Sequence, residues 1–190
     1  MYYMRIILLR HESRYEDPTL LTELTPEGKN RSIKLVESLS KYPIDSIYSS
    51  PFIRTLQTID PFSRHINKMI KVENGLYEYM VEGVFKPNNY YKLDDKIYST
   101  IIQDDFNIDG EYSSLVCAPG QEFETEVDLV TRVDKMLNKL VGKKRDKTIL
   151  LVSHMSTINA IIRRYVPDHD LDYPYPIGGI HVLEIDASAR

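Results

Sequence analysis

The stretch that decides the fold reads Arg5-Ile6-Ile7-Leu8-Leu9-Arg10-His11-Glu12 and lies near the start of the chain. Its apolar part is much shorter than the ~20 residues that a transmembrane helix needs, and charged residues follow where a signal peptide would have small ones. The run is therefore typical of a buried first strand. Arg10 and His11 come directly after this strand, at the end where open α/β sheets place their ligands.

Further strands and helices alternate along the rest of the chain. The predicted strands cover Arg5–Leu9, Ile44–Tyr48, Ile70–Val72, Thr148–Val152 and His181–Ile185. The predicted helices cover Pro26–Lys41, Phe52–Ile66, Glu122–Leu140 and Ser156–Tyr165. In the third helix a core-facing stripe is expected from Val127, Val130, Val133, Met136, Leu137 and Leu140. This order predicts an α/β fold, a three-layer α/β/α sandwich with a mostly parallel central sheet.

The length of the chain limits its domain organisation. With 190 residues and 42% hydrophobic composition, residues 1–190 are expected to form a single domain. The alternation breaks between about residues 80 and 117, where many tyrosines and acidic pairs occur. We expect a cap-like insertion there, with tyrosines that shape the mouth of a site, namely Tyr90, Tyr91, Tyr98 and Tyr112.

Charge and cysteine content narrow the classes of function. The formal net charge of −4 argues against a nucleic-acid-binding protein, so any anion site must be local. Cys117 is the single cysteine and cannot form an intramolecular disulfide, which fits a reducing compartment. No apolar run is long enough for a membrane span. We expect a soluble cytoplasmic protein, and the sequence leaves the oligomeric state open.

Two further predicted strands also end in reactive residues. Arg54 lies on the first turn of the helix after the second strand, and His154 follows the fourth strand. Each residue alone is typical of a surface charge or a structural histidine. Together with Arg10 and His11 they offer two guanidinium groups that can hold phosphate oxygens and an imidazole that can attack phosphorus. The joint placement therefore indicates a phosphate site.

Several short motifs carry a resemblance to a known family. They are Leu9-Arg10-His11, Leu24-Thr25-Pro26-Glu27-Gly28, Ser49-Ser50-Pro51 with Arg54 and Gln57-Thr58, Leu76-Tyr77-Glu78, and Val152-Ser153-His154. In this order the set resembles the histidine phosphatase, or phosphoglycerate mutase-like, superfamily. The resemblance implies a metal-independent phosphomonoester hydrolase without a cofactor. His11 is then the phosphorylated nucleophile, Arg10 and Arg54 hold the phosphate, His154 is the second histidine, and Glu78 is the proton donor.

The chain also departs from the family pattern. Glu12 stands where the family usually has glycine, which puts the local geometry in question. Arg14 resembles an extra phosphate-binding arginine of the tyrosine-phosphatase-like members, and an ordinary solvent-facing charge is the alternative. Met155 occupies the position of the acid used by another branch, which favours Glu78 as the donor, with Glu82 as the next candidate.

Two other functions remain open at this point. A phosphoglycerate mutase-type phosphotransferase shares the fold, but the chain lacks the tryptophan-asparagine pair that usually follows the first motif of the mutases. A catalytically inactive module that binds a phosphorylated ligand is the second alternative. The substrate can be a phosphorylated small molecule or a phosphoprotein, and neither a nucleic acid nor a membrane is expected as a partner.

Overall fold

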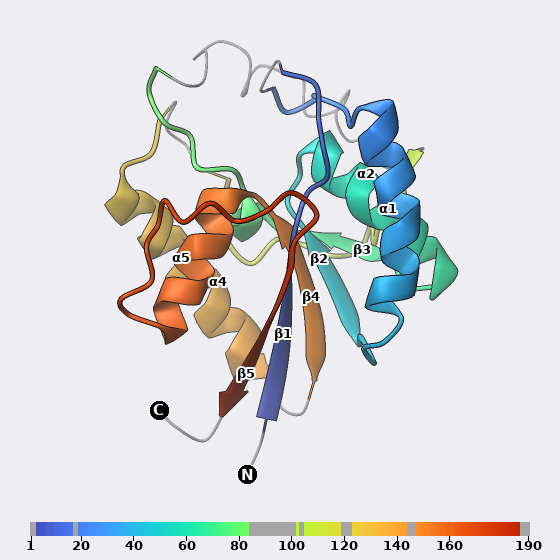
Figure 1. Cartoon of the computed structure of the whole chain (residues 1–190). Helices are drawn as coiled ribbons and strands as arrows, with labels where there is room; N and C mark the ends of the chain where they lie inside the picture. The colour runs from blue at the N-terminus through green and yellow to red at the C-terminus, as the bar shows by residue number, and fades with distance from the viewer. Residues whose placement is uncertain are drawn as a thin grey trace.

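A central five-stranded sheet organises the molecule (Figure 1). The computed structural model describes residues 3–16, 19–83, 102, 105–118, 123–143 and 147–186, to which the following statements refer. The strands are β1 (Tyr3–Arg10), β2 (Ser46–Ser49), β3 (Ile70–Val72), β4 (Thr148–Ser153) and β5 (Ile180–Asp186), in the spatial order β3-β2-β4-β1-β5. All neighbours pair in parallel except β5, which runs antiparallel to β1.

Helices cover both faces of this sheet. They are α1 (Pro26–Leu39), α2 (Ile53–His65), α4 (Glu126–Lys143) and α5 (Met155–Tyr165), with a short 3-10 turn η1 (Asn74–Leu76). Figure 1 shows α1 and α2 on one side of the sheet and α4 and α5 on the other. The predicted three-layer α/β/α sandwich is thereby confirmed. Among the described residues, no helix combines the length and the apolar character needed to cross a bilayer.

The first strand contributes to the core on both sides of the sheet. Ile6 and Leu8 belong to the apolar cluster under α4 and α5, while Ile7 and Leu9 belong to the cluster under α1 and α2. All four side chains are fully buried. A strand covered on both faces needs apolar residues at consecutive positions, which explains why the run is continuous rather than alternating.

Helix α4 differs from its prediction at both ends, since it ends at Lys143 and not at Leu140, and in its buried face. It begins at Glu126 and not at Glu122, because Thr125 and Asp128 cap its start: the Thr125 hydroxyl accepts from the Asp128 N–H (3.2 Å), and the Asp128 carboxylate accepts from the Thr125 N–H (2.9 Å). Val127 is 73% exposed, so its predicted core position is wrong. Leu129 is fully buried instead, because it shares a helix face with Val133, four residues further on.

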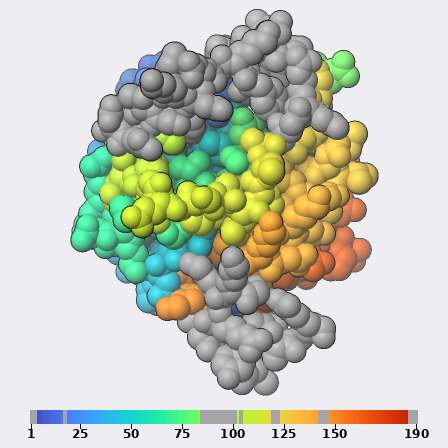
Figure 2. Space-filling view, turned by 180° about the vertical axis from the view of Figure 1, so that it is seen from behind, coloured from blue at the N-terminus to red at the C-terminus, as the bar shows by residue number. Residues whose placement is uncertain are grey.

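The end of the predicted insertion lies on the back of the molecule. Figure 2 shows residues 105–118 (yellow-green) between the α2 region and α4. Ile108 forms a bridge with Ile70 of β3, and the Tyr112 hydroxyl donates to Glu73 (2.6 Å). Lys139 of α4 donates from Nζ to the carbonyl of Leu115 (2.6 Å). This part of the insertion is therefore attached to β3 and α4, and Tyr112 is engaged inside the protein. Tyr90, Tyr91 and Tyr98 lie outside the described residues, so a cap over the site stays a prediction.

Candidate active site

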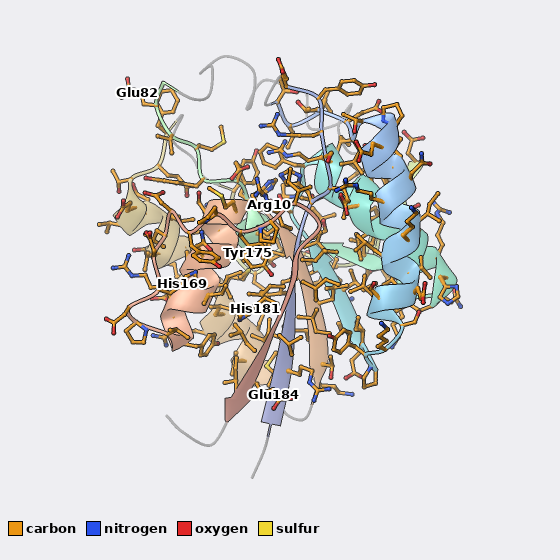
Figure 3. The ribbon with its side chains drawn as sticks, viewed as in Figure 1. Arg10, Glu82, His169, Tyr175, His181 and Glu184 are labelled. Carbon is orange, nitrogen blue, oxygen red and sulfur yellow. The ribbon has the colours of Figure 1, made fainter. Side chains whose placement is uncertain are left out.

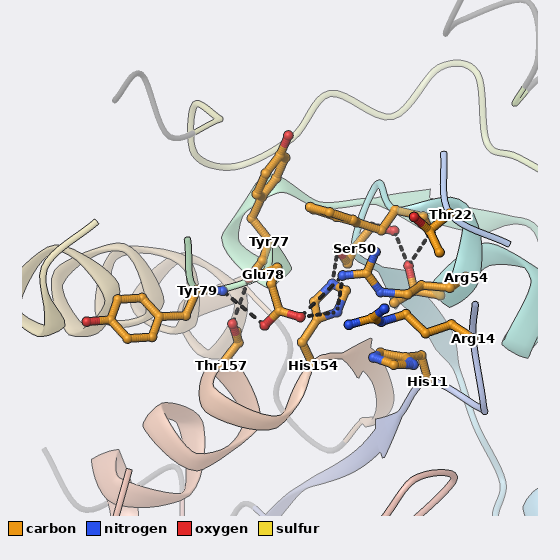
Figure 4. Close-up of polar contacts among 12 residues, drawn as sticks. His11, Arg14, Thr22, Ser50, Arg54, Tyr77, Glu78, Tyr79, His154 and Thr157 are labelled. Carbon is orange, nitrogen blue, oxygen red and sulfur yellow. Dashed lines mark hydrogen bonds and ion pairs between the residues drawn. The ribbon is translucent and has the colours of Figure 1, made fainter. Parts of the chain in front are cut away.

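The carboxyl ends of three adjacent parallel strands bring the predicted site residues together (Figure 4). In the strand register, Arg10 of β1 lies opposite Ser153 of β4, and Ser49 of β2 lies opposite Val152. The residues that follow these strands must therefore meet at one edge of the sheet. They are His11, His154 at the start of α5, and Arg54 in the first turn of α2.

His11 is buried and has one ring nitrogen fixed. Its Nδ1 lies 2.8 Å from the carbonyl oxygen of Glu12, which can only accept, so Nδ1 carries the proton. The pKa of His11 lies well below its ordinary value, because burial and the nearby His154 and Arg54 disfavour the charged ring. A neutral ring with its proton on Nδ1 leaves Nε2 with a free lone pair, as a nucleophile requires.

His154 lies beside His11, with the ring centroids 5.2 Å apart, and is fully buried. Its Nδ1 is 3.1 Å from Oε2 of Glu78, and its Nε2 is 2.9 Å from the hydroxyl of Ser50. Burial, only partly opposed by Glu78, lowers the pKa of His154 to about 4, so the ring is neutral at physiological pH. Since a carboxylate can only accept, Nδ1 donates to Glu78 and Nε2 accepts from the Ser50 hydroxyl.

Glu78 and Arg54 form an ion pair inside the site. Nη2 of Arg54 lies 3.2 Å from Oε2 of Glu78 and 3.3 Å from Nδ1 of His154. Arg54 is fully buried and donates from Nη1 to the carbonyl of Thr19 (3.0 Å). Its guanidinium lies over the Phe52 ring, with Cζ 4.3 Å from the ring centroid. Burial alone would raise the pKa of Glu78, but His154 and Arg54 outweigh it and hold this pKa below its usual range.

Arg10 and Arg14 add positive charge at the same edge. Nη1 of Arg10 donates to the carbonyl of Tyr175, while its buried Nε has no hydrogen-bond partner among the described residues (Figure 3). In Figure 4, Arg14 points toward the site, and its charge adds to burial in lowering the pKa of Arg10. Arg14 is half-buried and donates to main-chain carbonyls at Tyr15 (2.7 Å) and Glu16 (3.0 Å). Arg10 and Arg14 thus lie close enough for their charges to interact.

The side chains of two acidic residues that the sequence singles out, Glu12 and Glu82, do not point into the site. Glu82 is exposed and lies far from Arg10 in Figure 3, so the structure does not bring this second candidate acid to the site. The Glu12 carboxylate is buried against Gly178, where an added Cβ would lie 2.1 Å from its Oε1. The Glu12 N–H donates to the Thr58 hydroxyl (3.0 Å). Glu12 therefore contributes its main chain to the site, while its side chain faces a neighbouring turn.

The residue types also resemble a metal site, which can be tested on geometry. His11, Glu78 and His154 offer ligand atoms that all lie within 4.8 Å of one another. However, the buried guanidinium of Arg54 already contacts two of these ligands at 3.2 and 3.3 Å. A divalent cation would be repelled by this fixed charge in a poorly solvated environment. The arrangement fits a phosphoryl dianion better than a metal ion.

A separate cavity of about 350 Å³ lies beside α5, away from these residues. Acidic side chains line it, among them Glu126, Asp168, Asp170 and Asp172, with Arg163 as the opposite charge. A cavity with this excess of carboxylates does not attract a phosphate ester. It therefore does not compete with the histidine site for such a substrate.

The sequence did not reveal the residues that hold the site in place. Ser50 was visible in a motif without a role, yet its hydroxyl bonds His154. Ser153 and Thr157 donate to the carbonyls of Leu76 (2.7 Å) and Tyr77 (2.6 Å), just before Glu78. Hydroxyl residues of this kind are common in any chain, and only the strand register shows what they contact.

The comparisons with known proteins agree with this geometry. A family model described as histidine phosphatase superfamily (branch 1) matches residues 6–189. A search of curated protein sequences gives no match.

Solved structures share the fold at low sequence identity. The Bombix mori ecdysone phosphate phosphatase in complex with tungstate is 18% identical, with a TM-score of 0.68 and 94% and 88% of the two chains covered. A mycobacterial glucosyl-3-phosphoglycerate phosphatase is 19% identical, with a TM-score of 0.67 and coverage of 96% and 90%. The same mycobacterial enzyme with VO3 gives 19% identity, a TM-score of 0.67 and coverage of 94% and 92%.

Proposed function

Because the chain belongs to the histidine phosphatase superfamily, we propose that it hydrolyses phosphate monoesters through a phosphohistidine on His11, without a metal ion. The observation that carries this proposal is the state of His11. Its Nδ1 is bound to the Glu12 carbonyl at 2.8 Å, which leaves Nε2 as a neutral nucleophile beside buried positive charge. Double displacement of this kind needs a nucleophile, cationic groups and a proton donor, and the proximity of His11, Arg54 and Glu78 supports it.

In the first step the phosphoryl group lies between Arg10, Arg54 and the Nδ1–H of His154. Nε2 of His11 attacks phosphorus, and the bond to the ester oxygen breaks. Glu78 gives its proton to the departing oxygen. Glu78 is ionised in the free site. A bound phosphoryl dianion, however, pairs with Arg54 in place of Glu78 and places negative charge next to the Glu78 carboxylate. Substrate binding therefore raises the pKa of Glu78, so that its carboxylate takes up a proton from solvent as the ester binds and releases it again when the product phosphate leaves.

In the second step water replaces the alcohol. Glu78, now ionised, takes a proton from the water while the oxygen attacks phosphorus, and the bond to Nε2 breaks. The products are inorganic phosphate and neutral His11. Glu78 regains the proton that it lost, so protons and charge balance over the cycle.

A substrate panel tests the proposal. We expect the wild-type protein to release phosphate from aryl and alkyl phosphates in excess EDTA, and vanadate to inhibit it by occupying the place of the phosphoryl group. His11→Asn keeps a polar side chain at the strand end and should lower kcat by several orders of magnitude with an unchanged Tm.

Other outcomes would select the rival functions. Loss of activity in EDTA with recovery on adding zinc or magnesium would indicate a metallophosphatase. Isomerisation of 3-phosphoglycerate faster than release of phosphate would indicate a mutase. Binding of phosphate esters without turnover would indicate an inactive module.

A further inference from the structure

A buried ion pair between Arg132 and Glu124 has no part in the proposed chemistry. Arg132 of α4 binds Glu124 with two parallel hydrogen bonds, Nε to Oε1 and Nη2 to Oε2, both 2.7 Å long. The side chains are 7% and 5% exposed. Burying two charges is costly even when they are paired, so this pair must be explained by what else it contacts.

Two further donor groups of this pair bind one segment of the chain. Nη1 of Arg132 donates to the carbonyls of Gly75 (2.9 Å) and Tyr77 (3.2 Å). The main-chain N–H of Glu124 donates to the carbonyl of Met80 (2.8 Å). These carbonyls belong to residues 75–80, which we call the acid segment because it carries Glu78.

The acid segment is also held by the neighbours of His154. Ser153 and Thr157 bind the carbonyls of Leu76 and Tyr77 at 2.7 and 2.6 Å. Hence the segment is bound both by Arg132 of α4 and by Ser153 and Thr157, the neighbours of His154. Glu78 lies within this segment, and its Oε2 is 3.1 Å from Nδ1 of His154.

We propose that Arg132, held in one orientation by Glu124, is a positioning residue that sets the Glu78 carboxylate for proton transfer. This inference rests on the proposed role of Glu78 as acid and base. A lysine cannot replace the planar guanidinium, since one ammonium group cannot bind a carboxylate bidentately and two carbonyls together. A shift of the acid by about 1 Å is enough to slow a reaction substantially.

The test compares substrates with different needs for a proton. In Arg132→Lys and Glu124→Gln, we expect the kcat ratio of para-nitrophenyl phosphate over glycerol 2-phosphate to rise about tenfold, because the nitrophenolate leaves without a proton. KM should change little, since Arg10, Arg54 and His154 remain in place. In a Glu78→Gln background, Arg132→Lys should produce no further change in this ratio, because both substitutions act through the same carboxylate.

Ser63→Ala is the matched control. Ser63 is fully buried and donates to the carbonyl of Lys68 (2.7 Å) at the far end of α2. This variant should lower Tm and leave the ratio unchanged. The positioning role would be overturned if Arg132→Lys lowered kcat equally on both substrates. It would also be overturned if the effects of Arg132→Lys and Glu78→Gln on the kcat ratio were additive. Failure of both Arg132→Lys and Glu124→Gln to fold would overturn it as well, since the pair would then be purely structural.

A measurement independent of turnover separates this inference from the proposed function. In folded Arg132→Lys, the ¹⁵N chemical shift of His154 Nδ1 should change, because the bond to Glu78 is lengthened. If Glu78→Gln itself leaves the kcat ratio of the two substrates unchanged, the proposed acid role of Glu78 fails. The ¹⁵N chemical shift of His154 Nδ1 in Arg132→Lys then decides alone whether Arg132 positions the Glu78 carboxylate. An Nδ1 shift identical to that of the wild type would refute the positioning role.

Discussion

Glu12 is one residue from His11, yet its carboxylate is directed away from the site. It packs on Gly178, whose φ of +63° is a conformation that favours glycine. Its Oε2 is buried without a hydrogen-bond partner among the described residues. The sequence raised the question of a side chain where glycine is usual, but it could not answer it. The direction of that side chain depends on the turn around residue 178, which is distant in sequence.

The buried carboxylate predicts a pH-dependent stability. Burial raises the pKa of Glu12 above its ordinary 4.5, so the folded protein binds this proton more tightly than the unfolded chain. The resulting stabilisation is complete below about pH 4.5 and is lost as pH rises through the folded-state value. At pH 7 we expect Glu12→Gln to raise the free energy of unfolding by ~1 kcal/mol, because it removes a buried charge whose Oε2 has no hydrogen-bond partner among the described residues.

Urea denaturation of both proteins between pH 4 and pH 8 measures this difference. The advantage of Glu12→Gln should shrink as the pH approaches 4, because the wild-type carboxyl is then protonated as well. A variant that is less stable at pH 7, or a difference that does not vary with pH, would show that the charged Glu12 carboxylate is fully compensated by its partners or by solvent.

At the scale of elements, the pattern of apolar and polar residues predicts the strands and helices better than it predicts the contacts between them. The strand ends that carry His11 and His154 follow from short apolar runs, and the structure confirms their common edge. Arg132 and Glu124 look like ordinary surface charges in the sequence, since only the packing of α4 against residues 75–80 buries them. Val127 was misplaced because a valine at the start of a helix looks the same whether it is buried or exposed.

Glu73 shows how the end of the insertion is attached. This fully buried carboxylate accepts from the N–H groups of Gly75 (2.9 Å) and Leu115 (2.8 Å) and from the hydroxyls of Tyr112 (2.6 Å) and Ser114 (2.8 Å). Glu73→Gln replaces one acceptor with a donor that faces other donors. We expect a loss of ~2 kcal/mol in the free energy of unfolding.

Chemical denaturation checks this value, with Tyr112→Phe as the control. That variant removes one donor and leaves the carboxylate with three others, so it should cost only ~1 kcal/mol. A Glu73→Gln protein as stable as the wild type would mean that the carboxylate is not a fixed junction.

At the scale of the whole molecule, the charge distribution has a clear asymmetry. The chain carries a formal net charge of −4, while the charges of Arg10, Arg14 and Glu78 interact at one edge of the sheet, where Glu78 is paired with Arg54. The sequence predicted that any anion site must be local, because the chain as a whole is negatively charged. The parallel strand order explains how distant positive residues come together at one edge of the sheet. The form of residues 84–101 could not be predicted, because that stretch has no clear periodicity.

The central claim is that His11 carries the phosphoryl group during turnover, and direct detection of that bond tests it best. Protein stopped in alkali during turnover should show, by peptide mass spectrometry, one acid-labile and alkali-stable phosphoryl group on the peptide with His11. The label should accumulate in Glu78→Gln, whose second step lacks its base, and be absent from His11→Asn. A turning-over enzyme with the phosphoryl group on another residue, or with none in either the wild type or Glu78→Gln, would contradict the account.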